Sequence, residues 1–111
     1  MSLDPAIFRQ AYTFVVAARD AGIPLVIISG RRSAGYNVEV GGAPRSYHLD
    51  GLAFDVGVYG YTTQQLPLAW WTALGLWAES ALGLYWGGRF AHSSGRPDVN
   101  HFDARRYLVA A

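Results

Sequence analysis

The apolar residues near the N-terminus recur with the period of an α-helix. They recur three or four positions apart at Ile7, Ala11, Phe14 and Ala18, with Val15 next to Phe14. This spacing places them along one face of a helix. Asp4 suits the N-cap, Pro5 suits the first helical position, and Gly22 suits the end of the helix. We therefore predict a helix over about Pro5 to Ala21.

Two short apolar runs follow, and their lengths are typical of buried strands. The first is Leu25 to Ser29, and the second is Leu52 to Val58. Between them, Gly30 to Arg45 contains four glycines and one proline, which predicts a long irregular loop. Long loops in compact domains often carry functional residues.

A second helix is predicted to begin at Thr62, because Gln65 three residues later would complete a capping box. It would include Pro67 early and continue to Leu82, with Gly83 as its stop. The remaining predicted elements are two short strands and the loop between them: Leu84 to Trp86, Asn100 to Phe102, and Gly87 to Asp98. This order predicts a single α+β domain over residues 1–111, with a small, mostly antiparallel sheet flanked by helices.

Composition narrows the classes of function. Apolar residues make up 51% of the chain and charged residues 15%, which indicates a folded protein and excludes disorder. The absence of cysteine excludes disulfides and thiolate metal sites. With a net charge of +1, the chain does not have the strongly basic surface expected of a nucleic-acid-binding protein. No apolar run reaches the ~18 residues expected of a membrane span, so no membrane insertion is expected.

The candidate chemistry begins on the second predicted strand. Side chains alternate along a strand, so Asp55 shares a face with the small residues Gly51 and Ala53. We expect this face to be an open floor with space for a metal and a substrate. His48 lies seven residues before Asp55, so a turn near Gly51 is needed to bring the histidine over the carboxylate.

A second histidine near the C-terminus suggests a three-ligand metal site. His101 follows Asp98 by three residues. Two histidines, one carboxylate and one open position form a recurring catalytic zinc arrangement. Such a metal lowers the pKa of a bound water to about 7, and Asp98 is the candidate carboxylate to take the water's proton.

Two motifs in this order resemble a known family of peptidases. The first motif fixes five positions within ten residues: Ser46, His48, Gly51, Ala53 and Asp55. The second motif is Asp98-x-x-His101. Together with Ser29 to Ser33 and Trp86 to Gly88, they resemble the zinc D-alanyl-D-alanine carboxypeptidases and dipeptidases and the L-alanyl-D-glutamate endopeptidases of phage endolysins. The resemblance implies the hedgehog/DD-peptidase fold.

The resemblance also implies roles for individual residues around the metal. His48, Asp55 and His101 would bind Zn²⁺. Asp98 would act as the general base and then as the general acid. Carboxypeptidases of this family usually have glutamate at the position of Asp98, whereas the phage endopeptidases often have aspartate.

Four further residues are implied as substrate contacts. Arg32 would hold the substrate carbonyl or carboxylate and stabilise the oxyanion in the transition state. Arg31 stands where the family has tyrosine, so either arginine is a candidate for the substrate contact. Ser46 would hydrogen-bond near the site, and Trp86 is a candidate pocket wall.

The sequence therefore predicts a zinc peptidase that acts on peptidoglycan stem peptides, and most specifically an L-alanyl-D-glutamate endopeptidase. The alternatives are a D-alanyl-D-alanine carboxypeptidase or dipeptidase and, in another class, a zinc-stabilised binding module without turnover. Residues Met1 to Pro5 do not resemble the start of a secretory signal. We therefore expect synthesis in the cytoplasm and action on the cell wall after release or delivery. Phage lysis and a virion are two routes that would bring the protein there, and a bacterial enzyme is the alternative. The sequence does not indicate the oligomeric state.

Overall fold

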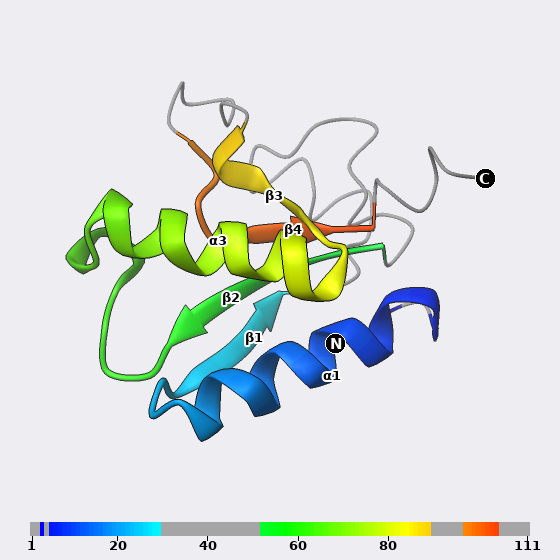
Figure 1. The fold of residues 1–111 in the computed structure, drawn as a ribbon. Coiled ribbons are helices and arrows are strands. Elements are labelled where there is room, and N and C mark those ends of the chain that lie inside the picture. Colours follow the sequence, from blue (N-terminus) through cyan, green and yellow to red (C-terminus); the bar gives the residue numbers. More distant parts are fainter. Residues whose placement is uncertain (1–2, 4, 30–51, 90–96, 105–111) are drawn as a thin grey trace.

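A computed structural model of the protein describes residues 3, 5–29, 52–89 and 97–104. Two α-helices and four strands form most of the described part, together with two short 3₁₀ turns (Figure 1). In chain order the elements are α1 (Pro5–Asp20), β1 (Leu25–Ser29), β2 (Ala53–Val58), η2 (Thr63–Gln65), α3 (Leu68–Leu82), β3 (Tyr85–Trp86), η3 (Gly87–Arg89) and β4 (His101–Asp103).

The first helix confirms the periodicity of the sequence. It ends at Asp20, one residue before the predicted end. The chain then turns at Gly22, whose φ of 85° is costly for residues with a Cβ. Ile7 and Phe14, from the predicted apolar stripe, have no exposed surface. The predicted N-cap, Asp4, lies outside the described residues.

The second helix begins later than predicted. Thr62 and Gln65 do interact, since the Thr62 amide donates to Gln65 Oε1 at 2.7 Å, but they close only the 3₁₀ turn η2. Leu66 is extended (φ −95°, ψ 131°) because the ring of Pro67 disfavours the helical conformation in the preceding residue. The α-helix α3 therefore starts at Leu68 instead of Thr62. Among the described residues, no helix combines the length and apolar character needed to cross a membrane.

The four strands form one sheet in the order β1-β2-β4-β3, and every neighbouring pair is antiparallel. Strand β4 begins one residue later than predicted, at His101. Phe54 of β2 pairs with Phe102 of β4, and Phe102 pairs with Trp86 of β3. The sheet and its two helices confirm the predicted α+β class.

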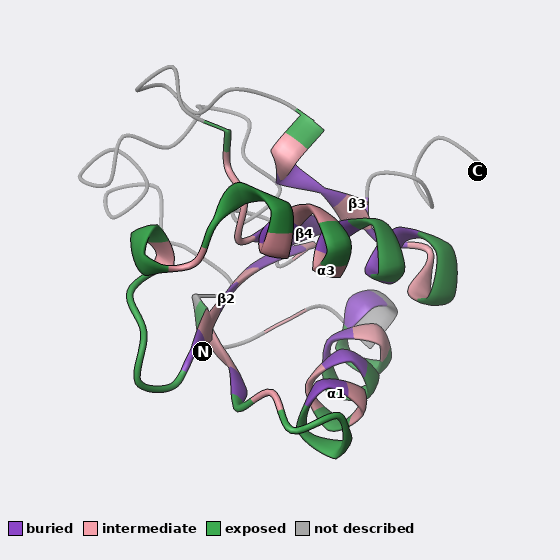
Figure 2. Ribbon diagram, turned by 60° about the vertical axis from the view of Figure 1, so that its left-hand side comes forward, coloured by how far each residue is buried: buried purple, intermediate pink, exposed green. Residues whose placement is uncertain are grey.

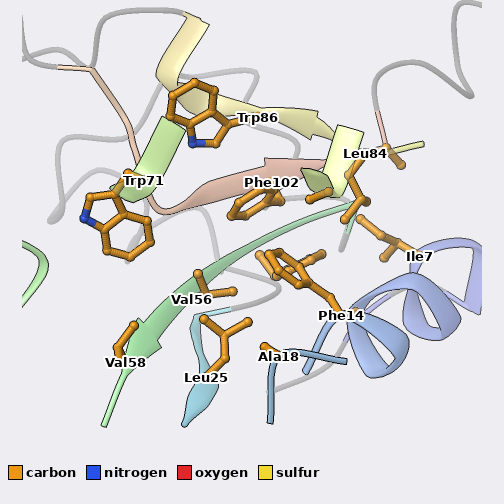
Figure 3. Close-up of a cluster of buried hydrophobic side chains, with 14 residues drawn as sticks. Ile7, Phe14, Ala18, Leu25, Val56, Val58, Trp71, Leu84, Trp86 and Phe102 are labelled. Atoms are coloured by element: carbon orange, nitrogen blue, oxygen red, sulfur yellow. The ribbon is translucent and has the colours of Figure 1, made fainter. Parts of the chain in front are cut away.

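The hydrophobic core lies between the sheet and the two helices. Phe14 of α1 meets the sheet with ring centroids 4.8 Å from Phe102 and 6.4 Å from Phe54. Figure 3 shows Phe14 and Phe102 pointing toward one another, with Leu84 beside them. In Figure 2 the buried residues lie on the strands and on the sides of the helices that face them. Both helices cover the face of the sheet that carries Phe54 and Phe102, so the side chains on its other face do not enter this core.

Candidate metal centre

The pairing of β2 with β4 brings two predicted metal ligands together. Asp55 and His101 are direct cross-strand partners, and such partners point to the same face of a sheet. Their neighbours Phe54 and Phe102 form the next pair and enter the core on the opposite face. Although Asp55 and His101 are 46 positions apart in the sequence, the register alone places them side by side.

The expected open floor beside Asp55 is wrong at one position. Ala53 shares the face of Asp55, but it has no exposed surface. Asp55 itself is partly exposed. The face is therefore covered at Ala53, the first residue of β2, and is partly open at Asp55, two residues further along the strand.

One nitrogen of His101 faces two carboxylates. His101 Nδ1 lies 3.7 Å from Asp55 Oδ1 and 3.8 Å from Asp98 Oδ2. The imidazole is buried, whereas the side chain of Asp98 is 24% exposed. The buried His101 therefore suits a metal ligand inside the fold, and the partly exposed Asp98 suits a general base that reaches solvent and substrate. Asp55 and His101, with Asp98 beside them, form the described part of the candidate metal centre.

A tight turn places Asp98 next to His101. The His101 amide donates to the Asp98 carbonyl at 3.1 Å, and the Asp98 amide donates to the Gly87 carbonyl at 3.2 Å. Asn100 fastens the turn to β2, since its Nδ2 donates to the Val56 carbonyl at 3.0 Å and its own carbonyl accepts from the Val56 amide at 2.9 Å. Asn100 is a supporting residue that the sequence analysis missed, and no local pattern distinguishes it from other loop asparagines.

Gly87 lies in close contact with this turn. A Cβ added to Gly87 would overlap the carbonyl oxygen of Asp98 and the Cβ of His101. Any larger residue would therefore push the turn away from β3. The glycine pair after Trp86, which resembled a family feature in the sequence, has a packing function here.

Trp86 is not brought to the metal centre. It pairs with Phe102, so its side chain points to the core face rather than the face of His101. Its indole is 5% exposed, donates to the Val99 carbonyl at 2.6 Å and lies in a space that a Cβ on Gly75 or Gly88 would enter. These contacts make Trp86 a packing residue (Figure 3). Its predicted contact with substrate stays a prediction that they do not support.

A buried carboxylate anchors the same segment to α3. Glu79 accepts hydrogen bonds from the Trp86 amide at 3.1 Å and from Arg89 Nη2 at 2.6 Å. Glu79 is buried while Arg89 is exposed, so the carboxylate is held by donors that replace the lost water. The anchor fixes η3, and with it Gly87, against the Asp98–His101 turn.

Asp103 flanks the predicted ligand His101, and the sequence allowed two interpretations of it: a carboxylate that faces solvent, or one that hydrogen-bonds to a metal ligand. The sequence signal was available, because residues two apart on a strand share a face and Asp103 follows His101 by two. The structure buries Asp103 completely, and His101 Nε2 donates to its Oδ2 at 2.8 Å. Asp103 thus holds the ring nitrogen that faces away from Asp55 and Asp98.

Opposing effects shift the pKa of His101. Burial of the ring lowers the pKa and is the largest single effect. The hydrogen bond with Asp103, the contact with Asp55 and the negative charges of both carboxylates act in the other direction and together outweigh burial. The pKa of His101 is therefore raised from 6.5 to about 9. The metal-free imidazole is positively charged at neutral pH.

We expect the metal-free protein to lose stability as the pH rises from about 6.5 to about 9. The pKa of His101 is higher in the folded chain than in the unfolded chain, so its stabilising contribution is complete below pH 6.5 and is lost as the pH passes through 9. A shift of this size corresponds to on the order of 3 kcal/mol of unfolding free energy.

Urea denaturation in the presence of a chelator measures this dependence. Because other groups titrate in the same pH range, a His101→Gln variant is measured alongside the wild type. The quantity to follow is the difference between their unfolding free energies at each pH. That difference should shrink as the pH rises. A constant difference would mean that the ring is not preferentially protonated in the fold.

Four predicted site residues lie outside the described residues: Arg31, Arg32, Ser46 and His48. The same holds for the predicted loop from Gly30 to Arg45 and for the turn near Gly51. The roles assigned to them stay predictions.

The described part of the centre suits a zinc ion. An imidazole nitrogen and a carboxylate oxygen are both common zinc ligands, and His101 Nδ1 and Asp55 Oδ1 supply one of each. Within residues 3, 5–29, 52–89 and 97–104, no group of three or more His, Cys, Asp or Glu is arranged to hold a metal ion. A three-ligand site therefore requires a ligand from elsewhere in the chain, and His48 is the predicted one.

Comparisons with known proteins agree with the motifs. Comparison with curated proteins gives no match. Among solved structures, the chain resembles the LdcB LD-carboxypeptidase, whose structure is described as revealing the molecular basis of peptidoglycan recognition. The TM-score is 0.68 at 18% sequence identity, over 99% of this chain and 71% of that chain. At this identity the likeness shows the fold, and it confirms the predicted fold class.

The sequence also matches a family model described as Peptidase M15 over residues 3–75. This range contains Asp55 and, in sequence, the predicted positions of His48, Ser46 and the two arginines. Because the model matches more than half of the chain, this protein belongs to the Peptidase M15 family.

Proposed function

We propose that this M15 peptidase uses zinc to hydrolyse the stem peptides of peptidoglycan, as an L-alanyl-D-glutamate endopeptidase that acts on the cell wall after release or delivery. Peptidases of this family are generally metal-dependent. The observation that carries the proposal is the convergence of Asp55, Asp98 and His101 Nδ1 on one face of the sheet. The printed description of the LdcB structure, which names peptidoglycan recognition, supports the choice of substrate.

The residues of the site divide into ligands and a base. Asp55 and His101 would hold the metal together with His48. When bound, zinc supplies Lewis acidity that activates water and polarises the scissile carbonyl. Asp98 is partly exposed beside these ligands, in a position to accept a proton from water and return it to the leaving amine. Arg32 is proposed to bind the substrate carbonyl and the developing oxyanion.

The choice between an endopeptidase and a carboxypeptidase rests on one residue and one likeness. Aspartate at position 98 resembles the phage endopeptidases, whereas carboxypeptidases of the family usually have glutamate there. The name of LdcB favours the other candidate, because it is an LD-carboxypeptidase. We place the endopeptidase first because Asp98 belongs to this chain's own site.

Peptidoglycan digestion tests the proposal directly. The purified protein is incubated with peptidoglycan in the presence of zinc, with a chelator, and with the chelator followed by excess zinc. Mass spectrometry then identifies the new termini. New ends at L-alanine and D-glutamate that vanish with the chelator and return with zinc are the expected result.

The other fragment patterns distinguish the alternatives. Release of a single D-alanine would establish a carboxypeptidase. Cleavage that persists after complete removal of metal would contradict the use of zinc. A folded, zinc-loaded protein that cleaves nothing would contradict the peptidase and favour the binding module.

A further inference from the structure

We propose that Asp103 is a positioning residue for His101, which fixes the imidazole so that Nδ1 is the nitrogen presented to the metal. The inference rests on the proposed zinc peptidase. Asp103 contacts the nitrogen of His101 that faces away from Asp55 and Asp98, and the motif Asp98-x-x-His101 does not include it.

The contacts of the ring divide its two nitrogens. Nε2 donates to Asp103 Oδ2 at 2.8 Å. Nδ1 faces the carboxylates of Asp55 and Asp98 at 3.7 and 3.8 Å. The nitrogen toward the candidate centre is therefore Nδ1, and Nε2 is occupied by a hydrogen bond within β4.

The chemistry of a carboxylate makes this division strict. An ionised carboxylate only accepts hydrogen bonds, so the nitrogen bonded to Asp103 must carry a proton. In a neutral imidazole only one of the two ring nitrogens carries a proton. When that proton is on Nε2, the lone pair that can bind a metal is on Nδ1. A carboxylate behind a ligand histidine also raises the basicity of the ligand and fixes the orientation of the ring.

Burial and strand geometry hold the pair in place. Asp103 is fully buried, so water does not compete for its oxygen. The two residues lie on the same face of β4, and the backbone of β4 is bonded to β2 on one side and β3 on the other. The carboxylate and the ring are thus fixed relative to Asp55 before any metal arrives.

Zinc affinity tests the proposal in the full chain. The variants are Asp103→Ala and Asp103→Asn, with Asp20→Ala at the exposed end of α1 as the matched control. Affinity is measured by competition with a chromophoric chelator. Asp103→Ala should bind zinc about 10- to 100-fold more weakly than the wild type. Asp103→Asn, whose amide oxygen still accepts from Nε2, should lose less, and Asp20→Ala should bind as the wild type does.

The tautomer supplies a readout that needs no Asp103 variant. In the zinc-loaded wild type labelled with ¹⁵N-histidine, NMR should show His101 with a proton on Nε2 and the metal on Nδ1, with the resonance assigned by its absence in His101→Gln. A metal on Nε2 would overturn the proposal. Zinc affinity in a folded Asp103→Ala equal to that of the wild type would also overturn it.

The test of Asp103 and the test of the proposed function can fail separately. A wild type that binds zinc through Nδ1 but cleaves no peptidoglycan would overturn the peptidase proposal and support the role of Asp103. A wild type that cleaves peptidoglycan with the metal on Nε2 would do the reverse.

Discussion

Replacing Asp98 by alanine should lower peptidoglycan cleavage by about 10²- to 10⁴-fold while zinc stays bound, because general acid–base catalysis typically contributes this much. The structure places Asp98 Oδ2 3.8 Å from His101 Nδ1, close to the centre yet partly exposed. The backbone of the Asp98–His101 turn is held by main-chain bonds and by Asn100. Removing the carboxylate should therefore leave the turn in place.

Two measurements on the same samples separate the possible roles of Asp98. Turnover is followed by fragment release, and bound zinc is determined by metal analysis after gel filtration. The conservative variant Asp98→Asn should be as inactive as Asp98→Ala, since an amide cannot accept the proton. Loss of zinc together with activity would make Asp98 a ligand instead of a base. Unchanged activity in Asp98→Ala would remove it from the mechanism.

Replacing Asp55 by alanine should abolish both tight zinc binding and cleavage. Asp55 is the cross-strand partner of His101 and supplies the described carboxylate ligand. A ligand that binds only the folded state stabilises it, by about 4 kcal/mol at a thousand times its dissociation constant. The wild type should therefore show a large rise in melting temperature with added zinc, and Asp55→Ala should show almost none.

The melting experiment carries its own control for misfolding. Asp20→Ala changes an exposed aspartate outside the site and should retain the full zinc-dependent rise. Without zinc, Asp55→Ala should still unfold cooperatively, because its side chain is on the opposite face of the sheet from the core. A zinc-dependent rise in Asp55→Ala equal to that of the wild type would show that the metal does not use this carboxylate.

The local patterns of the sequence were sufficient where one element decides the outcome. The apolar period of α1 depends only on which residues face the core, and the helix forms at the predicted position. Gly83 ends α3 with a φ of 69°, as the C-terminal glycine suggested. The start of α3 was predicted wrongly because the capping pair Thr62 and Gln65 was weighed above the effect of Pro67 on Leu66.

For the site, the sequence by itself determined which residues are candidates. The motif residues Asp55, Asp98 and His101 were named from spacing and resemblance alone, and the structure brings these three together. The residues that hold these candidates in place could not be predicted in the same way. Asn100 and Glu79 belong to no motif, because their importance comes from contacts with segments distant in the sequence. Gly87 was part of the resemblance, but its contact with the Asp98–His101 turn appears only in the structure.

Only the tertiary structure decided how the candidates face one another. The β2–β4 register makes Asp55 and His101 neighbours, and it turns Trp86 toward the core with Phe102. It also buries Asp103 against Nε2 of His101, so that Nδ1 is left for the carboxylates of the centre. The physical reason is the two-residue period of a strand: the sequence gives the order of side chains, but the pairing of strands decides which of them meet.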